Sequence, residues 1–141
     1  MENKTHSTNI QKISKFLKDA GIFYLLTTEG TQPKGRPFAF HMVKNNTIYF
    51  ATVTFKDVYK QMKENPLVEI TATMESEFIR YDGIAVFDED QSLVEKVLEI
   101  MPEIKELYKD RSDFTLAVFH IEKGNVEIRN MTKIVDMFEV Q

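Results

Sequence analysis

The chain has 141 residues, the length of one domain, and we interpret residues 1–141 as a single domain with its own hydrophobic core. The formal net charge of −4 disfavours binding to nucleic acid or to a membrane surface, and the absence of cysteine excludes disulfides, thiolate nucleophiles and cysteine-based metal sites. The N-terminus is polar and no apolar run approaches the roughly 20 residues of a membrane span, so we expect a cytoplasmic protein.

Three stretches have the apolar spacing of helices, namely residues 9–20, 55–64 and 91–109. Thr8 is expected to be the N-cap of the first helix, and Gly21 is expected to cap its C-terminus. Thr54 and Asp57 have the spacing of a capping box, which places the start of the second helix at Thr54. Pro102 predicts either a kink in the third stretch or the first turn of a separate helix.

The remaining apolar stretches have the pattern of β-strands, namely residues 22–29, 36–43, 47–53, 67–74, 78–87, 114–121, 125–130 and 133–140. Short polar segments at 30–35, 44–46 and 122–124 are typical of tight turns. Strands joined by tight turns predict an antiparallel sheet. We therefore expect a mainly β (α+β) fold, in which the sheet closes into a barrel with helices packed outside.

The usual catalytic and nucleotide-binding motifs are missing. The five glycines are too scattered for a dinucleotide fingerprint or a P-loop, and the three histidines do not have the spacing of metal ligands, so we expect no metal site. His6 is expected on a tail, and His41 has no assigned role. His120 alternates with apolar residues, which indicates a core or rim histidine with a hydrogen-bond partner. No side chain is identified as catalytic.

A row of lysines marks the start of the predicted helix at 55–64. Lys56, Lys60 and Lys63 share one helix face, which in many surface helices is simply a solvated basic stripe. However, the helix dipole disfavours a cation in the first turn by roughly 0.3–1 kcal/mol. A helix N-terminus also presents free N–H donors that suit a phosphate. Lys56 is therefore a candidate phosphate ligand.

Arg36 is the second candidate ligand. If residues 36–43 pair with 47–53 in a hairpin, Arg36 lies beside Thr52 and at the same end as Lys56. An arginine can hold a phosphate through two parallel hydrogen bonds. We predict a phosphate-binding corner made of Arg36, Thr52, Thr54 and Lys56; the alternative is that Arg36 pairs with a surface carboxylate.

Four segments together resemble a known family, namely GRPFAF (35–40), IYFAT (48–52), FKDVYKQMKENPLVEI (55–70) and EFIRYDGIAVFDED (77–90). In order and spacing they are similar to the pyridoxamine 5′-phosphate oxidase-like, FMN-binding split-barrel superfamily, and most similar to its small nitroimidazole-resistance and general-stress proteins. The similarity extends over about residues 20–130. It implies a six-stranded antiparallel split β-barrel with flanking helices, and a homodimer that binds two FMN molecules at the subunit interface.

The resemblance also implies roles for single residues. It assigns contacts with the flavin nucleotide to Arg36, Pro37 and Phe38, and the ribityl-phosphate wall to Ala51 and Thr52. It assigns the phosphate to Lys56 and implies a weaker cofactor contact, possible across the dimer, for Arg80; the alternative for Arg80 is an ion pair within the barrel. At the helix start, Asp57 replaces a cation that many family members have there.

The function implied by this resemblance is that of an FMN-dependent oxidoreductase that reduces a small flat acceptor such as a nitro-aromatic or a quinone. A nicotinamide nucleotide or another donor would supply the electrons, and Phe38, Phe40 and Tyr49 either line a pocket for the acceptor or belong to the core. Vitamin B6 synthesis is not expected, because the chain lacks the basic, histidine-bearing C-terminal segment of true pyridoxamine phosphate oxidases. The alternative is a non-enzymatic carrier or sensor that binds flavin, haem or another phosphate ligand.

Overall fold

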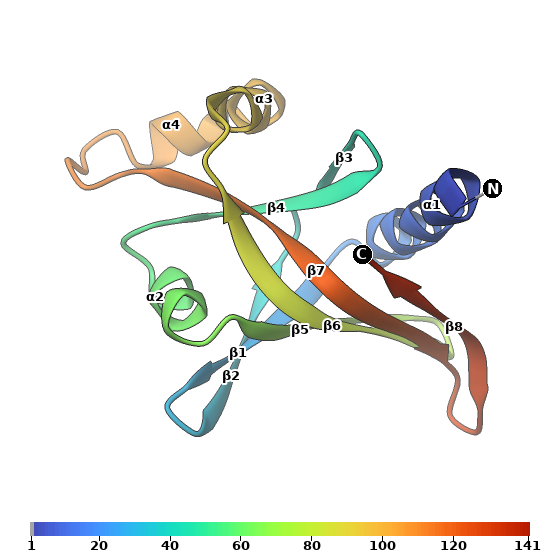
Figure 1. Ribbon diagram of the computed structural model, residues 1–141. Coiled ribbons are helices and arrows are strands. Elements are labelled where there is room, and N and C mark those ends of the chain that lie inside the picture. Colours follow the sequence, from blue (N-terminus) through green and yellow to red (C-terminus); the bar gives the residue numbers. More distant parts are fainter. Residues whose placement is uncertain (1) are drawn as a thin grey trace.

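The computed structural model describes residues 2–141, with helices and strands as labelled in Figure 1. The helices are α1 (Glu2–Ala20), α2 (Asp57–Glu64), α3 (Gln91–Ile100) and α4 (Glu103–Leu107). The strands are β1 (Phe23–Glu29), β2 (Gln32–Phe38), β3 (Met42–Lys44), β4 (Thr47–Val53), β5 (Leu67–Met74), β6 (Glu77–Asp88), β7 (Leu116–Arg129) and β8 (Ile134–Val140). Among these residues, no helix is long and apolar enough to cross a membrane.

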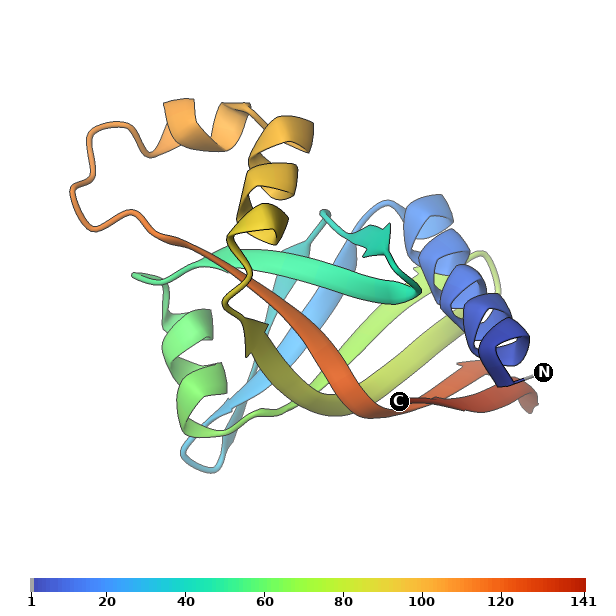
Figure 2. The same ribbon diagram turned by 45° about the horizontal axis from the view of Figure 1, so that its top comes forward.

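The strands form one antiparallel sheet with the order β2-β1-β5-β6-β7-β4-β3, and β8 pairs with β7 beside this path. The fold is therefore mainly β with flanking helices, as expected. This confirms the predicted split β-barrel type, with eight strands in place of the six that the resemblance implied. The closed barrel expected from the strand pattern is wrong, because no hydrogen-bonded pairing joins β2 to β3. Figure 2 shows how the long, curved strands β6 and β7 wrap the sheet into an open barrel, with the helices placed around it.

The longest strand, β7, corrects the prediction of two strands separated by a turn at 122–124. Its first part pairs with β4 and its second part pairs with β8, while β6 pairs with it along most of its length. The register shifts next to Gly83, where the predicted turn becomes a β-bulge. A Cβ atom at Gly83 would lie 2.5 Å from the side chain of Ile121 and 2.7 Å from the carbonyl oxygen of Glu122, so the crossing of the two strands requires glycine.

The predicted hairpin of residues 36–43 with 47–53 is wrong in its first half. Residues 32–38 form β2 and pair with β1, which places Arg36 opposite Leu25. Only the short strand β3 pairs with β4. The chain leaves the sheet at 39–41, so one predicted strand becomes two strands at opposite ends of the sheet.

The helix boundaries also differ from the predicted ones. α1 begins at Glu2, so Thr8 lies inside it, where its hydroxyl donates to the carbonyl oxygen of Lys4 at 2.9 Å. His6 is consequently on a helix rather than on a tail. Gly21 ends α1 with a φ of 82°, and its N–H donates to the carbonyl oxygen of Leu17. Pro102 separates α3 from α4, which confirms the second of the two interpretations of this proline.

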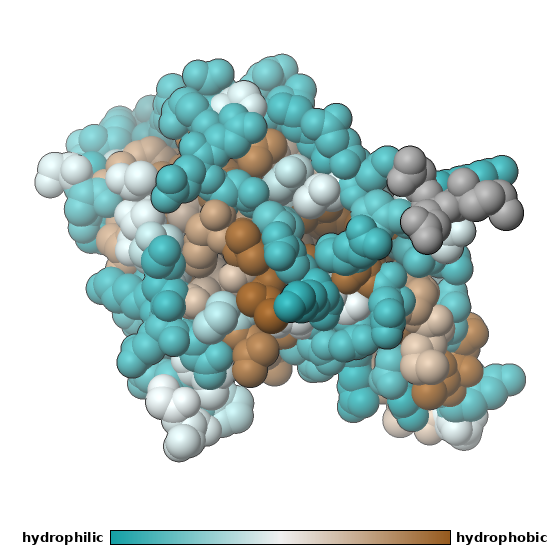
Figure 3. Space-filling model, viewed as in Figure 1, coloured by the Kyte–Doolittle hydropathy of each residue, from teal (hydrophilic) through white to brown (hydrophobic). Residues whose placement is uncertain are grey.

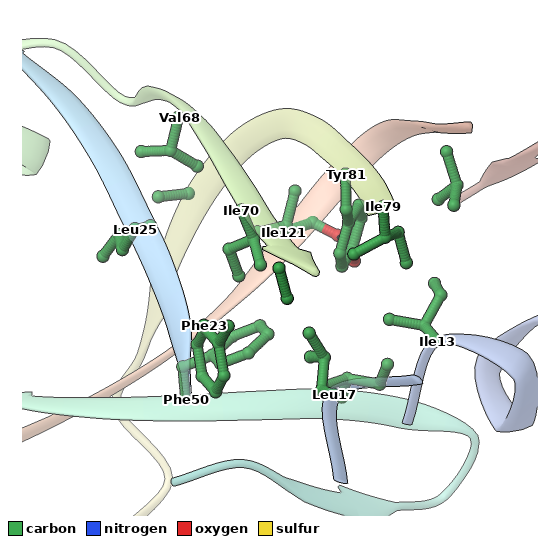
Figure 4. Packing of buried hydrophobic residues seen from close by; sticks show 14 of the residues in the cluster. Ile13, Leu17, Phe23, Leu25, Phe50, Val68, Ile70, Ile79, Tyr81 and Ile121 are labelled. Atoms are coloured by element: carbon green, nitrogen blue, oxygen red, sulfur yellow. The ribbon is translucent and has the colours of Figure 1, made fainter. Parts of the chain in front are cut away.

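The main core lies between α1 and the inner face of the sheet. Ile13 and Leu17 of α1 point toward strand residues in Figure 4, and Phe23 packs edge to face against Phe50 with the ring centroids 5.7 Å apart. A second cluster forms where Leu93 and Val97 of α3 cover Met42, Leu116 and Val118. The two clusters hold β4 between them, and β4 leads directly to the candidate site.

Candidate functional site

Two adjoining cavities lie where β2, β4 and α2 meet. One has a volume of about 280 Å³ and a mostly apolar wall drawn from β2, β4, α4 and the segments that flank them. The other is more open and more polar, has a volume of about 530 Å³, and includes Glu29 and Asp57 in its wall. Arg36, Lys56 and Val58 line both cavities. The arrangement suits a ligand with a flat apolar part and an anionic part.

Arg36 reaches the boundary between the cavities from β2. Its Nη1 donates to the carbonyl oxygen of Leu25 at 3.1 Å and to the hydroxyl of Thr27 at 2.7 Å, and its Nη2 donates to Oε1 of Gln61 at 2.7 Å. Burial lowers the pKa of Arg36, and the charge of Asp57 raises it by a smaller amount. The half-buried guanidinium forms no ion pair within residues 2–141, and it keeps N–H donors for a ligand. The predicted alternative, a surface carboxylate partner, is therefore not found.

Lys56 approaches the same boundary from the start of α2. It is the N-cap of this helix, in place of the predicted Thr54, and no side chain caps the helix there. The reason is that the N–H of Thr54 donates to the carbonyl oxygen of Thr115, which holds Thr54 at the edge of the sheet. The ammonium of Lys56 lies 5.6 Å from the ring centroid of Tyr108. The first N–H groups of α2 consequently lack the predicted side-chain cap and can donate hydrogen bonds to an anion.

Buried polar side chains gather around Arg36 and Lys56, at the boundary of the two cavities, which we call the corner. Of the described residues, Thr27, Thr52 and Gln61 are the polar residues classed as buried, with 4%, 6% and 7% of their surface exposed. Thr27 and Gln61 hold Arg36, and Thr52 lies in the wall of the apolar cavity. Burying polar groups costs free energy unless they are hydrogen-bonded, so their concentration in one place is typical of a functional site.

Part of the wall of the apolar cavity consists of residues that the sequence analysis singled out, and another part was not predicted. Pro37, Phe38, Phe40, Ala51 and Thr52 line the cavity. Arg36 and Thr52 both line this cavity although β2 and β4 are not paired. The unforeseen wall comes from α4 and the residues next to it, namely Met101, Ile104, Leu107 and Tyr108. Leu107 is 71% exposed, so this wall of the cavity is open to solvent.

Three residues singled out from the sequence lie elsewhere. Thr54 is absent from the described walls of both cavities. Arg80 lies on the outer face of β6, with Nη1 3.9 Å from a carboxylate oxygen of Glu127, in agreement with the ion-pair alternative. Tyr49 packs with the second core cluster, and its ring lies 5.9 Å from that of His120.

Comparison with known proteins identifies the family to which the chain belongs. The family model of pyridoxamine 5′-phosphate oxidase matches residues 10–127, a span that includes every residue of the corner. The chain belongs to the pyridoxamine 5′-phosphate oxidase family. A comparison with curated proteins finds no match.

Solved structures of similar proteins support this assignment. A nimC/nimA family protein of Clostridium acetobutylicum is 32% identical, covers 94% of this chain and 94% of its own, and superposes with a TM-score of 0.82. General Stress Protein 26 of Bacillus anthracis shares the fold at 16% identity, with 93% and 98% of the two chains covered and a TM-score of 0.67. A heme binding protein of Mycobacterium smegmatis shares it at 14% identity, with 95% and 57% covered and a TM-score of 0.64.

The histidines of this family member lie away from the corner. His120 bridges two carboxylates, with Nδ1 2.7 Å from Asp88 and Nε2 2.8 Å from Glu122. Burial lowers the pKa of His120. The hydrogen bonds and charges of the two carboxylates raise it by a larger amount, so the pKa lies above its usual value. His41 contacts the hydroxyl of Ser14 at 3.0 Å. Within the described part of the chain, no group of three or more His, Asp or Glu side chains is arranged to hold a metal ion.

Proposed function

We propose that the protein binds FMN at this corner and acts as an FMN-dependent oxidoreductase that reduces a small flat acceptor, such as a nitro-aromatic or a quinone. The observation that carries the proposal is that Arg36 and Lys56, from separate elements, line both the polar and the apolar cavity. Membership of the pyridoxamine 5′-phosphate oxidase family supports a flavin as the ligand. The similarity to a nimC/nimA family protein supports a branch other than vitamin B6 synthesis.

The residues of the corner fit the chemistry of FMN. The phosphate would take the free donors of Arg36, the ammonium of Lys56 and the first N–H groups of α2. The flat ring would lie against the apolar wall that includes Phe38, Phe40 and Ala51. Asp57 is the unfavourable element, because its carboxylate lines the polar cavity and repels a phosphate. We therefore expect moderate rather than very tight FMN binding.

The protein's own contribution to the reaction is binding, orientation and charge. FMN, when bound, would supply the chemistry of electron transfer between a donor such as a nicotinamide nucleotide and the acceptor. Arg36 and Lys56 place positive charge near the cofactor, and positive charge favours the reduced, more anionic flavin. The apolar wall would exclude water from one side of a bound flavin ring. No described side chain at the corner needs to act as acid, base or nucleophile for this chemistry.

The colour of the protein tests the proposal. Purified protein, or protein mixed with FMN and freed of excess, should show flavin absorption bands. Under anaerobic conditions NADH or NADPH should bleach these bands, and a nitro-aromatic or a quinone should restore them. A protein that neither contains nor takes up FMN would refute the proposal.

A second candidate is a carrier or sensor that binds flavin or haem without turnover. The observation that favours it is the shared fold with a protein described as heme binding, since Arg36 and Lys56 would also suit haem propionates. If NADH, NADPH and other biological reductants all fail to bleach the flavin bands, this candidate would be supported. A Soret band after incubation with haem, without uptake of FMN, would replace the flavin proposal altogether.

We also propose that the protein forms a homodimer. Large apolar side chains remain exposed on the segment around β8, namely Met131, Ile134, Val135 and Met137. Figure 3 shows hydrophobic residues at β8 and near the crossing of β6 and β7, on a face that is otherwise mostly hydrophilic. Apolar patches of this kind are typical of interfaces. Light scattering coupled to size-exclusion chromatography should give twice the monomer mass of 16.5 kDa, and the monomer mass would refute the dimer.

A further inference from the structure

Gln61 is an unusual residue for the buried face of a helix. It lies in the middle of α2 with 7% of its surface exposed, and each of its polar atoms has a partner. Oε1 accepts from the hydroxyl of Thr27 at 2.5 Å and from Nη2 of Arg36 at 2.7 Å. Nε2 donates to a carboxylate oxygen of Glu29 at 3.3 Å. Gln61 thereby connects α2, which carries Lys56, to β2, which carries Arg36.

The acceptors that hold Arg36 share one property: they are all neutral. They are a backbone carbonyl, a hydroxyl and the amide oxygen of Gln61. A carboxylate is close at hand in Glu29, but it contacts the amide nitrogen of Gln61 and not the guanidinium. A carboxylate in direct contact would form an internal ion pair and satisfy the charge of Arg36. The neutral amide fixes the guanidinium in place without cancelling its charge.

We propose that Gln61 is a positioning residue, which holds Arg36 at the boundary of the two cavities and keeps its positive charge available for an anionic ligand. The inference rests on the proposed function where it concerns FMN. The arrangement of Gln61, Thr27 and Arg36 is independent of which anion binds. The positioning role also explains why a glutamine is buried at position 61, where an apolar residue could pack without needing a polar partner.

A charge swap tests the inference without changing the net charge. In the double variant Gln61→Glu with Glu29→Gln, the new amide at position 29 can donate to the new carboxylate at position 61. The carboxylate then accepts from Thr27 and Arg36 in place of the amide. The hydrogen bonds are preserved, and the negative charge moves from position 29 to position 61, where it contacts the guanidinium of Arg36 directly. FMN and, separately, inorganic phosphate should bind about 10–100-fold more weakly, the scale of one charge-assisted hydrogen bond.

Two controls make the result specific. The variant Glu29→Gln alone removes a negative charge and should bind FMN at least as tightly as the wild type. The double variant should unfold at a urea concentration close to that of the wild type. If the folded double variant binds FMN and phosphate as the wild type does, the neutrality of Gln61 is irrelevant and the inference is wrong.

A readout without ligand separates this inference from the proposed function. In ¹⁵N NMR spectra, the Arg36 side chain of the wild type should show slowly rotating, resolved N–H signals. Gln61→Leu should merge or broaden them, because one of the bonds that restrain the guanidinium is lost. Unchanged Arg36 signals in a folded Gln61→Leu variant would overturn the positioning role. If the wild type fails to bind FMN but its Arg36 signals respond to Gln61→Leu, only the proposed function falls.

Discussion

Replacing Lys56 by alanine should weaken FMN binding and leave the fold almost unchanged. The side chain of Lys56 is exposed, and its ammonium lies 5.6 Å from the ring centroid of Tyr108. An exposed cation–π contact contributes about 0.5–1 kcal/mol, which sets the upper range of the stability loss. A charge-assisted hydrogen bond to a phosphate is worth about 1.5–3 kcal/mol, so the Kd of FMN should rise by a factor of about 10–100.

Lys63 is a matched control for this experiment. It lies in the last turn of the same helix, and its ammonium is 5.5 Å from the ring centroid of Phe87 and 6.0 Å from that of Tyr59. Lys63→Ala therefore makes the same change in net charge and loses contacts of the same kind. Quenching of FMN fluorescence gives the Kd, and urea unfolding gives the stability. We expect Lys63→Ala to bind FMN within about twofold of the wild type. Equal losses in both variants, or no loss in Lys56→Ala, would show that the start of α2 does not hold the phosphate.

Two further predictions concern the sheet. Gly83→Ala should destabilise the protein by about 1–3 kcal/mol, the usual cost of overpacking, because its Cβ would lie 2.5 Å from the side chain of Ile121; urea unfolding measures this. His120 has a raised pKa in the folded protein, so its protonation stabilises the fold below the unfolded pKa of about 6.5, and this contribution is lost as pH rises through the folded pKa. The stability difference between the wild type and His120→Gln should therefore be larger at acidic than at alkaline pH.

Each of these two predictions has a clear contrary result. A Gly83→Ala variant as stable as the wild type would mean that β6 and β7 do not cross as closely as described. Gly30→Ala offers a contrast, because a Cβ there meets no atom within 4 Å and the cost would come from its positive φ. For His120, a stability difference that does not change with pH would mean that Asp88 and Glu122 do not raise its pKa. The pH range should extend well to either side of the unfolded value.

The sequence predicted the mainly antiparallel fold because most strands are bounded by local signals. The pairing of the strand that carries Arg36 with β1 was not predicted, for a physical reason. Two short turns flank its strand, at Gly30 and at 44–46, and either could have closed the hairpin. Apolar alternation continues through 39–41, where the chain leaves the sheet, so the break leaves no local trace. Which neighbour a strand takes depends on distant residues.

The site was predictable in its cations and not in its framework. Lys56 stood out because a cation opposes the helix dipole in the first turn. Gln61 and Thr27 carried no such signal, since their role depends on a contact between residues 34 positions apart. The same holds for α4, whose Ile104 and Leu107 read as an ordinary apolar stripe until the fold brings them to the cavity. The Thr54 cap failed because a backbone bond to Thr115 restrains that residue.

A crystal structure of the protein with bound FMN tests the central claim most directly. The account predicts the phosphate within hydrogen-bonding distance of Arg36 and Lys56, next to the first N–H groups of α2, and the flavin ring against the apolar wall at Phe38 and Ala51. An FMN phosphate bound elsewhere, with Arg36 and Lys56 turned to bulk water, would contradict it.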